Sequence, residues 1–421
     1  MDGPAKAKVG ALQASMERKM ARIVRWKTLI VASAAYALVA GCSTPDRLPA
    51  VPSASALQAG EALGPIRFLV SRESDSFAAE ARSALAREQQ WLASEGKGGE
   101  LPPAYFLAIS GGGDNGAYGA GFLNGWTASG TRPEFKVVTG ISTGALIAPF
   151  AFLGPKYDYV LERVYTTTAQ KDIFKKRGLK SLIWGDSMVD TTPLANVIST
   201  YVTPEFLQEI ADQHAKGRVL LIGTTNLDSL EPVIWNMGAI ASSSDPRAVS
   251  LFRSILLASA SIPGAFPPVM IDVSIDGTPY QEMHVDGGTV TQVFLYPPSV
   301  SAASVAPRKR VLYIIRNARM DADWASTERR TMTIAMRAIE SLTRTQGIGD
   351  LYRIYATTQR DGIDFNLTYI PATFNTPHRE QFGTAYMKSL YDVGAAAAKT
   401  GFQWQKYPPG FEAPIQAGIR E

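Results

Sequence analysis

The sequence predicts an α/β fold built on a central, mostly parallel β-sheet that helices cover on both faces. The chain has 421 residues, 46% hydrophobic and 19% charged, which is the composition of a folded protein with a large core. After residue 103, short apolar runs alternate with segments of helical spacing. A glycine-rich turn joins the first of these runs to the next helix, as in parallel sheets.

The first 42 residues have the pattern of an export signal. They contain seven Lys or Arg against Asp2 and Glu17, and the apolar run 29–40 follows the basic stretch. This run is too short to span a bilayer comfortably. The segment carries a net charge of +5. Because the whole chain carries +4, the other 379 residues carry −1. A nearly neutral body lacks the broad basic face that nucleic acid binding needs, so we expect no nucleic acid partner.

Cys42 is the only cysteine, and it follows Val39, Ala40 and Gly41. This tetrad resembles the lipoprotein box of bacteria, in which the cysteine is lipidated and becomes the first residue of the mature chain. Ser43 resembles the residue that follows the cysteine in lipoproteins sorted to the outer membrane. We therefore expect an exported protein of the cell envelope, held in the outer membrane by its lipidated N-terminus and facing the periplasm or the exterior. A cleaved secretory signal with a chance cysteine, or a short N-terminal anchor, is the alternative.

Four segments are expected. Residues 1–42 form the signal, and residues 43–100 form a tether rich in Pro, Ser and Ala followed by a helix over 77–93. Residues 101–300 form the catalytic core. Residues 301–421 form a C-terminal α/β extension packed on that core.

The core opens with the strand predicted over 105–109, which runs into the sequence GGGDNG at 111–116. A glycine-rich turn before a helix leaves backbone N–H groups free to bind an anion or an oxyanion. The same glycines fit a dinucleotide-binding fingerprint, which requires an acidic residue near the end of the second strand. The next predicted strand, 135–138, has Glu134 at its wrong end. We therefore expect no nucleotide cofactor.

The second strand leads into GISTG at 140–144, which fits the G-x-S-x-G pattern of a nucleophilic serine on a tight strand-to-helix turn. The apolar residues 145–148 open a helix after it. A glycine-lined turn with an incidental serine is the alternative for Ser142.

A nucleophilic serine needs a base. The order Ser142, Asp286, His378 satisfies the triad of α/β-hydrolases. However, His378 lies in the polar, turn-like stretch NTPHR, and His284 is more typical of a hydrogen-bonded structural residue. The triad therefore remains the second interpretation, and the three scattered histidines do not form a metal site.

Five segments in order resemble the blocks of the patatin-like phospholipases, over roughly residues 101–294. They are 111–116 (GGGDNG), 140–144 (GISTG), 190–194 (DTTPL), 258–268 (ASASIPGAFPP) and 286–288 (DGG).

The resemblance implies a three-layer α/β/α acyl hydrolase that uses a Ser-Asp dyad without histidine and without a cofactor. Ser142 would attack the ester carbonyl of a phospholipid, lysophospholipid or other acyl-ester lipid, and Asp286 would take its proton. The oxyanion would be held by the backbone N–H groups of Gly111, Gly112, Gly113 and Asp114. Asn115 stands where the family usually carries Arg or Lys. The loss of this charge favours the competing class, an inactive envelope lipoprotein that binds lipid or a partner.

One further helix is predicted near the C-terminal end. Five arginines from Arg329 to Arg353 share a helical region with Ile334, Ile339 and Leu342. Contact with anionic lipid is conceivable, but a solvated charged face is the simpler interpretation.

Overall fold

The computed structural model describes residues 20, 46–62, 66–70, 72–178, 186–321, 324 and 326–411. Residues 47–178 and those from 187 onward form one compact unit. Cys42, with the export signal predicted around it, lies outside the described residues. Among the helices within the described ranges, none is long and apolar enough to cross a bilayer.

The centre of the unit is a mixed sheet whose described part has nine strands. Seven follow the order β1-β7-β6-β3-β2-β10-β11, while β9 pairs with β6 and β8 pairs with β9. The five strands from β6 to β11 in this order are parallel, and β1, β7, β8 and β9 pair antiparallel. The strands are β1 (Arg67–Leu69), β2 (Ala104–Ile109), β3 (Val137–Ile141), β6 (Val219–Asn226), β7 (Glu231–Asn236), β8 (Val269–Ile275), β9 (Thr278–Asp286), β10 (Arg310–Arg316) and β11 (Ile363–Tyr369). A separate ribbon pairs β4 (Lys175–Lys176) with β5 (Val189–Asp190).

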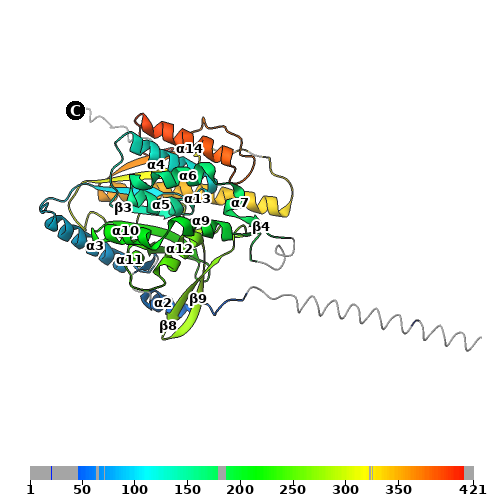
Figure 1. The fold of residues 1–421 in the computed structure, drawn as a ribbon, viewed down its shortest axis with the longest axis horizontal. Helices are drawn as coiled ribbons and strands as arrows, with labels where there is room; N and C mark the ends of the chain where they lie inside the picture. Colours follow the sequence, from blue (N-terminus) through cyan, green and yellow to red (C-terminus); the bar gives the residue numbers. More distant parts are fainter. Residues whose placement is uncertain are drawn as a thin grey trace, which may run out of the picture. The chain divides into compact units, whose positions relative to one another are not determined.

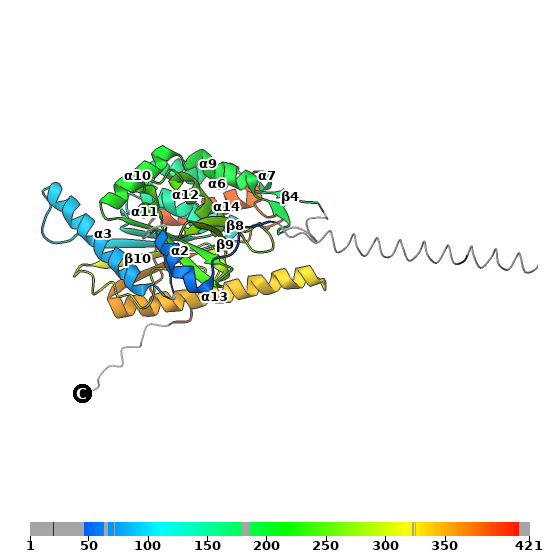
Figure 2. The same ribbon diagram turned by 90° about the horizontal axis from the view of Figure 1, so that it is seen from below.

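Helices cover both faces of this sheet (Figures 1 and 2). One layer contains α4 (Gly116–Ala128), α5 (Thr143–Leu153), α6 (Asp158–Thr167), α9 (Thr192–Tyr201), α10 (Pro204–Ala215), α12 (Ala248–Ser259) and α14 (Thr384–Lys399). The opposite layer contains α3 (Ser74–Ser94) and α13 (Thr331–Asp361). The shorter helices are α2 (Ala56–Ala62), α7 (Gln170–Ile173) and α11 (Met237–Ala241), with 3-10 turns that include η2 (Gly113–Asn115) and η4 (Gly287–Thr289).

Each face of the sheet has its own core. The larger cluster lies under α4, α5 and α14, where residues such as Phe122 and Ile147 are fully buried. On the other face, α13 packs Leu351 and Ile354 against β10 and β11, and α3 packs Phe77 against β1. Because β2 is buried on both faces, its sequence AYFLAI is apolar throughout instead of alternating.

The predicted α/β fold with a mostly parallel sheet is confirmed. The helix predicted over 77–93 is α3, and the strands predicted over 105–109 and 135–138 are β2 and β3, with ends shifted by up to three residues. β10 lies between β2 and β11, so the segment 301–421 supplies two strands of the same sheet.

Candidate active site

Ser142 lies on the sharp turn between β3 and α5, with φ 56° and ψ −126°. A positive φ is unfavourable for a residue with a side chain and costs about 1–3 kcal/mol, so the surroundings must hold this conformation. Two glycines make the turn possible. A Cβ at Gly140 would clash with the carbonyl of Gly144, and a Cβ at Gly144 would clash with the carbonyls of Ile109 and Ser110. The G-x-S-x-G spacing thus has a steric reason.

The backbone of this turn is held from behind by Ser259, at the end of α12. The Ser142 N–H donates to Ser259 Oγ over 3.0 Å, and the Ser259 hydroxyl donates to the carbonyl of Gly223 over 2.7 Å. Ser259 is fully buried. It therefore links the turn to β6 and positions Ser142 without itself facing the pocket.

Strand pairing brings Asp286 to Ser142. On one side of β6, Ile141 of β3 pairs with Gly223, and Asp286 of β9 pairs with the following residue, Thr224. On this side of β6, the pairing with β9 therefore begins where the pairing with β3 ends. Ser142 follows Ile141 directly, so the two predicted catalytic residues meet although 143 residues separate them in the chain.

The Asp286 carboxylate is buried, with the residue 5% exposed. Burial raises the pKa of this carboxyl to about 7, although the hydrogen bonds from the Ser142 hydroxyl and the Gly288 N–H oppose the shift. The Gly288 N–H donates to Oδ1 over 2.7 Å. A carboxylate whose pKa is near neutrality is a far better general base than a solvated aspartate.

The glycine-rich loop lies against the same serine. A Cβ at Gly111 would stand 3.2 Å from Ser142 Cβ. The Gly111 N–H donates to the carbonyl of Gln292 over 3.0 Å, so this amide is already engaged in this conformation, and its role in binding an oxyanion stays a prediction. Within the described residues, no acceptor is found for the N–H groups of Gly112, Gly113 and Asp114. These three amides, followed by the N-terminus of α4, remain the candidates for an oxyanion hole.

Several side chains fix the loop in place. Asn317, at the end of β10, donates to the carbonyl of Ser110 over 2.9 Å and accepts from the Gly119 N–H over 3.0 Å. A Cβ at Gly112 would clash with the carbonyl of the same Asn317. The loop is therefore seated on β10 at a point where only glycine fits.

The C-terminal segment before α14 covers the loop from the other side. Asp114 Oδ2 accepts from His378 Nε2 and from the Phe382 N–H, each over 2.7 Å. Asn115 Oδ1 accepts from the Tyr386 hydroxyl over 2.6 Å. Asn115, which replaces the expected basic residue, is thus part of a hydrogen bond between the loop and α14.

His378 is not brought to Asp286, so the triad considered as the alternative is not assembled in this structure. His284 is fully buried on β9 and contacts Thr224 Oγ1 over 3.0 Å and Glu282 Oε2 over 3.2 Å. These contacts confirm the structural role expected for it. In the part of the chain that the structure describes, no group of three His, Cys, Asp or Glu is placed to hold a metal ion.

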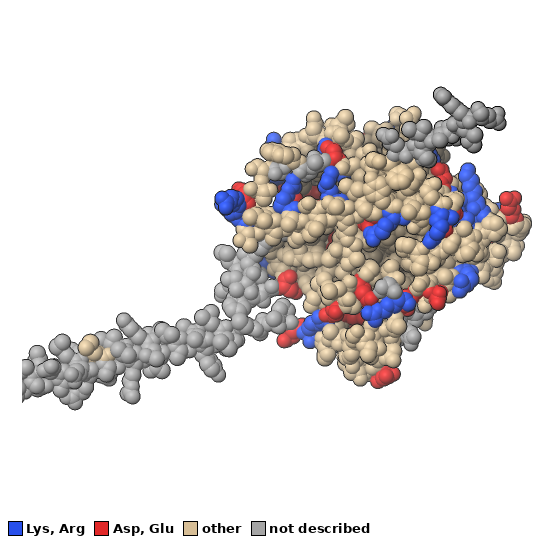
Figure 3. Space-filling model, turned by 180° about the vertical axis from the view of Figure 1, so that it is seen from behind, with Lys and Arg blue, Asp and Glu red and all other residues tan. Residues whose placement is uncertain are grey.

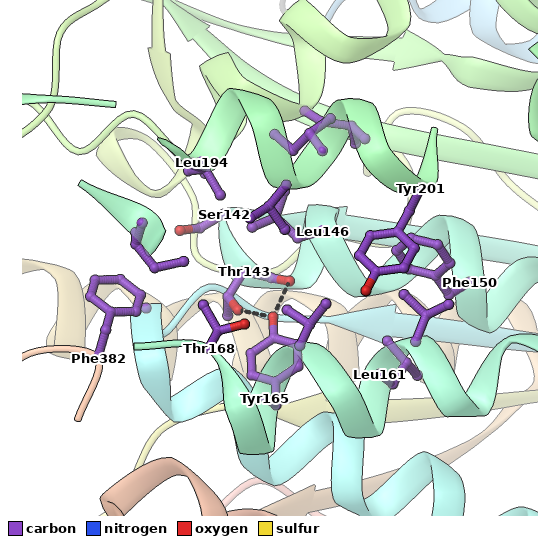
Figure 4. A pocket seen from close by; sticks show the side chains of 18 of the residues that line it. Ser142, Thr143, Leu146, Phe150, Leu161, Tyr165, Thr168, Leu194, Tyr201 and Phe382 are labelled. Carbon is purple, nitrogen blue, oxygen red and sulfur yellow. Dashed lines mark hydrogen bonds between the residues drawn. The ribbon is translucent and has the colours of Figure 1, made fainter. Parts of the chain in front are cut away.

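A long apolar pocket begins at Ser142 and runs between α5, α6, α9 and α12 (Figure 4). The empty space in it and at its opening amounts to about 890 Å³, including open solvent. Leu146 and Phe150 follow Ser142 at intervals of one helical turn on α5, and Phe150 and Tyr201 lie at the far end. Among the described residues that line the pocket, none is charged. The pocket therefore fits a hydrocarbon chain whose carbonyl end lies at Ser142.

The sequence did not reveal Ser259, Gln292, Asn317 or Phe382 as parts of this site. Ser259 lies in one of the segments that resembled the family, and that was its only signal. The other three reach the site through contacts between distant elements, which no local pattern encodes.

Comparison with known proteins gives one family. Residues 107–297 match the family model described as patatin-like phospholipase. No curated protein matches the chain.

Three solved structures illustrate the distant likeness. VipD from Legionella pneumophila is 12% identical, with 73% of this chain and 68% of VipD covered and a TM-score of 0.30. Human GIVD cytosolic phospholipase A2 is 10% identical, with 72% and 54% covered and a TM-score of 0.31. The type III effector protein ExoU is 13% identical, with 73% and 55% covered and a TM-score of 0.24. The family likeness rests on the family model alone, which residues 107–297 match as patatin-like phospholipase.

Proposed function

We propose that the protein is a serine lipid acyl hydrolase of the phospholipase A or lysophospholipase type. One observation carries the proposal: a serine held at positive φ contacts a buried carboxyl of pKa about 7 at the end of a long apolar pocket. The patatin-like domain supports lipid esters as the substrate class. The apolar pocket supports a fatty acyl chain as the part of the substrate that is bound.

The chemistry needs only groups of this chain and water. Ser142 Oγ attacks the ester carbonyl while its proton passes to the ionised Asp286 carboxylate. The amides of Gly112, Gly113 and Asp114 stabilise the tetrahedral oxyanion. Collapse of this intermediate breaks the ester bond, and Asp286 returns the proton to the leaving alcohol. Water then cleaves the acyl-Ser142 ester with Asp286 again as the base, which releases fatty acid and restores the serine.

Release of fatty acid from phospholipid vesicles by the purified protein tests this function. We expect Ser142→Ala and Asp286→Ala to lose at least about 10³-fold of the activity while they remain folded. His378→Ala is the matched control, and it should keep most of the activity because the Phe382 N–H still donates to Asp114 when the His378 side chain is removed. Loss in His378→Ala equal to that in Ser142→Ala would restore the triad. If the unmodified protein releases no acid from phospholipids, lysophospholipids or simple esters, the binding-module interpretation replaces the hydrolase.

We further propose that the protein is an envelope lipoprotein acylated on Cys42. The support is the single cysteine behind a short apolar run and a basic stretch. An acyl anchor would raise the concentration of the site at a lipid surface. Cys42→Ser should abolish incorporation of labelled fatty acid into the protein. Incorporation that persists in this variant would contradict the assignment.

A further inference from the structure

The first half of α13 projects beyond the sheet, at the end of the parallel strands near which the candidate active site lies. Crossover helices run back along their strands, and α13 joins β10 to β11, which are parallel and pair over seven residues. A helix of 31 residues is about 46 Å long, whereas seven residues of strand span about 23 Å. Roughly half of the helix therefore has no strand beside it.

The excess lies at the N-terminal end of α13. Gly347 stands against the guanidinium of Arg316, the last residue of β10, and Gln346 donates to the carbonyl of Val290. Residues 331–346 therefore lie beyond the end of the sheet. At this end β2 leads into the glycine-rich loop and β3 leads into Ser142. Figures 1 and 2 agree that this end of α13 lies at the same end of the unit as α7, which lines the apolar pocket.

Burial changes at the same point. Among residues 331–346, no side chain that the structure describes is buried, whereas buried residues recur every three or four positions from 347 to 361. Ile334, Ile339 and Leu342 are 51%, 41% and 70% exposed. Ile334, Ala338 and Leu342 follow at intervals of four, so they share one side of the helix. Trp324, just before the helix, is 86% exposed. An amphipathic helix that presents aliphatic side chains to solvent lacks its partner.

The charges of the segment indicate what the partner is. Residues 326–346 contain four arginines against Glu328 and Glu340, a net charge of +2, although the body of the protein is nearly neutral. Arg330 contacts Glu328 and Arg337 contacts Glu340, which leaves the segment with an excess of positive charge. Figure 3 shows the face over which α13 runs, where Lys and Arg side chains stand beside broad uncharged surface. Aliphatic residues with arginines beside them, and an exposed Trp, are typical of helices that lie in the interface of an anionic membrane.

We propose that Trp324 and residues 326–346 form a membrane-docking surface for anionic lipid. The surface lies beyond the end of the parallel strands where β3 leads into Ser142, so its insertion brings that end of the sheet to the bilayer. An N-terminal anchor alone does not fix the orientation of the protein on the membrane, whereas a docked surface does. The proposal rests on the proposed function for the identity of the substrate, but docking itself requires no hydrolysis.

Hydrogen exchange of the full chain tests the docking. The Ser142→Ala protein is compared with and without vesicles that contain phosphatidylglycerol and phosphatidylcholine, and with vesicles of phosphatidylcholine alone. We expect the amides of 331–346 to exchange about tenfold more slowly on the anionic vesicles, and less so on the neutral ones. The exchange is measured for the amides of α13 alone, so it does not depend on how the N-terminus is attached to the membrane. A protein without hydrolase activity can still show the protection.

Two variants sharpen the result. Ile334→Ser with Leu342→Ser should weaken the vesicle-dependent protection by at least about tenfold, since two aliphatic side chains no longer leave water. Tyr159→Ser is the control. Tyr159 is 60% exposed, but it lies near the start of α6, and α5 separates this point from Ser142 by its full length. Equal protection in the double variant would overturn the proposal, as would the absence of any vesicle effect. Protection that appears without lipid and grows with protein concentration would also overturn it, because a second copy would then cover the surface.

Discussion

Replacement of Asp286 by asparagine should abolish activity and at the same time stabilise the fold. The substitution keeps the size of the side chain and an oxygen that can accept the Gly288 N–H, which lies 2.7 Å from the present carboxylate. It removes the negative charge that the buried position holds at high pH. The base is thereby lost, and so is the cost of ionising a carboxyl away from water.

The size of the effect follows from the pKa. Burial raises the pKa of Asp286 to about 7 in the folded protein, and an unfolded aspartate has a pKa of about 4. Between these values the folded state keeps a proton that the unfolded state has released, so the free energy of unfolding falls as pH rises. Three pKa units correspond to about 4 kcal/mol. The stability gained by Asp286→Asn should therefore be small at pH 4, grow up to pH 7 and level off above it.

Denaturant unfolding of both proteins at several pH values measures this difference. Asp361→Asn is a control of opposite sign. Although burial alone would raise the pKa of Asp361, the hydrogen bonds from Arg360, Tyr296 and Ser301 hold it well below its usual range. Its removal should destabilise the protein at neutral pH, and the loss should shrink as pH falls. Stability curves of the wild-type protein and Asp286→Asn that run parallel in pH would refute the reasoning.

Three further outcomes follow from the site. The kcat/KM for ester hydrolysis should rise with pH to a plateau, with a midpoint near the pKa of about 7, because Asp286 must be ionised; a rate independent of pH between 5 and 9 would contradict this. Gly112→Ala should lower kcat by about 10²–10³ because its Cβ meets the Asn317 carbonyl and displaces the oxyanion amides; Gly349→Ala, where nothing lies within 4 Å, should leave kcat unchanged. Leu146→Trp should lower kcat/KM for a palmitoyl ester at least about tenfold more than for a butyryl ester, because it blocks the pocket one turn from the nucleophile; an equal loss for both esters would show that the pocket does not hold the chain.

Local patterns predicted much of the sheet. The apolar run 105–109 is β2, because a central parallel strand is buried on both faces and stands out by composition. The predicted strand 135–138 begins two residues before β3 does. It also ends three residues too soon, because β3 extends through Thr139 and Gly140 to Ile141. Gly140 is a poor strand former, and tertiary packing overrides that preference.

The arrangement of the site was predictable only in part. The glycines around Ser142 indicated a tight turn because each has a steric reason to be glycine. The pairing of Asp286 with β6 depends on a register between distant strands, so only the resemblance to a family suggested it. The contacts of His378 with Asp114 and of Gly111 with Gln292 depend on tertiary packing, and the sequence contains no signal for either. The exposed aliphatic side of α13 was likewise hidden, since helical spacing does not show which side meets the core.

The central claim is that Ser142 is a nucleophile that Asp286 activates, and covalent labelling tests it without knowledge of the natural lipid. A fluorophosphonate should react with the wild-type protein, and mass spectrometry should find one adduct on the peptide that contains Ser142. Asp286→Asn should react at least about 10²-fold more slowly while it stays folded. An adduct on a different serine, or an undiminished rate in Asp286→Asn, would contradict the account.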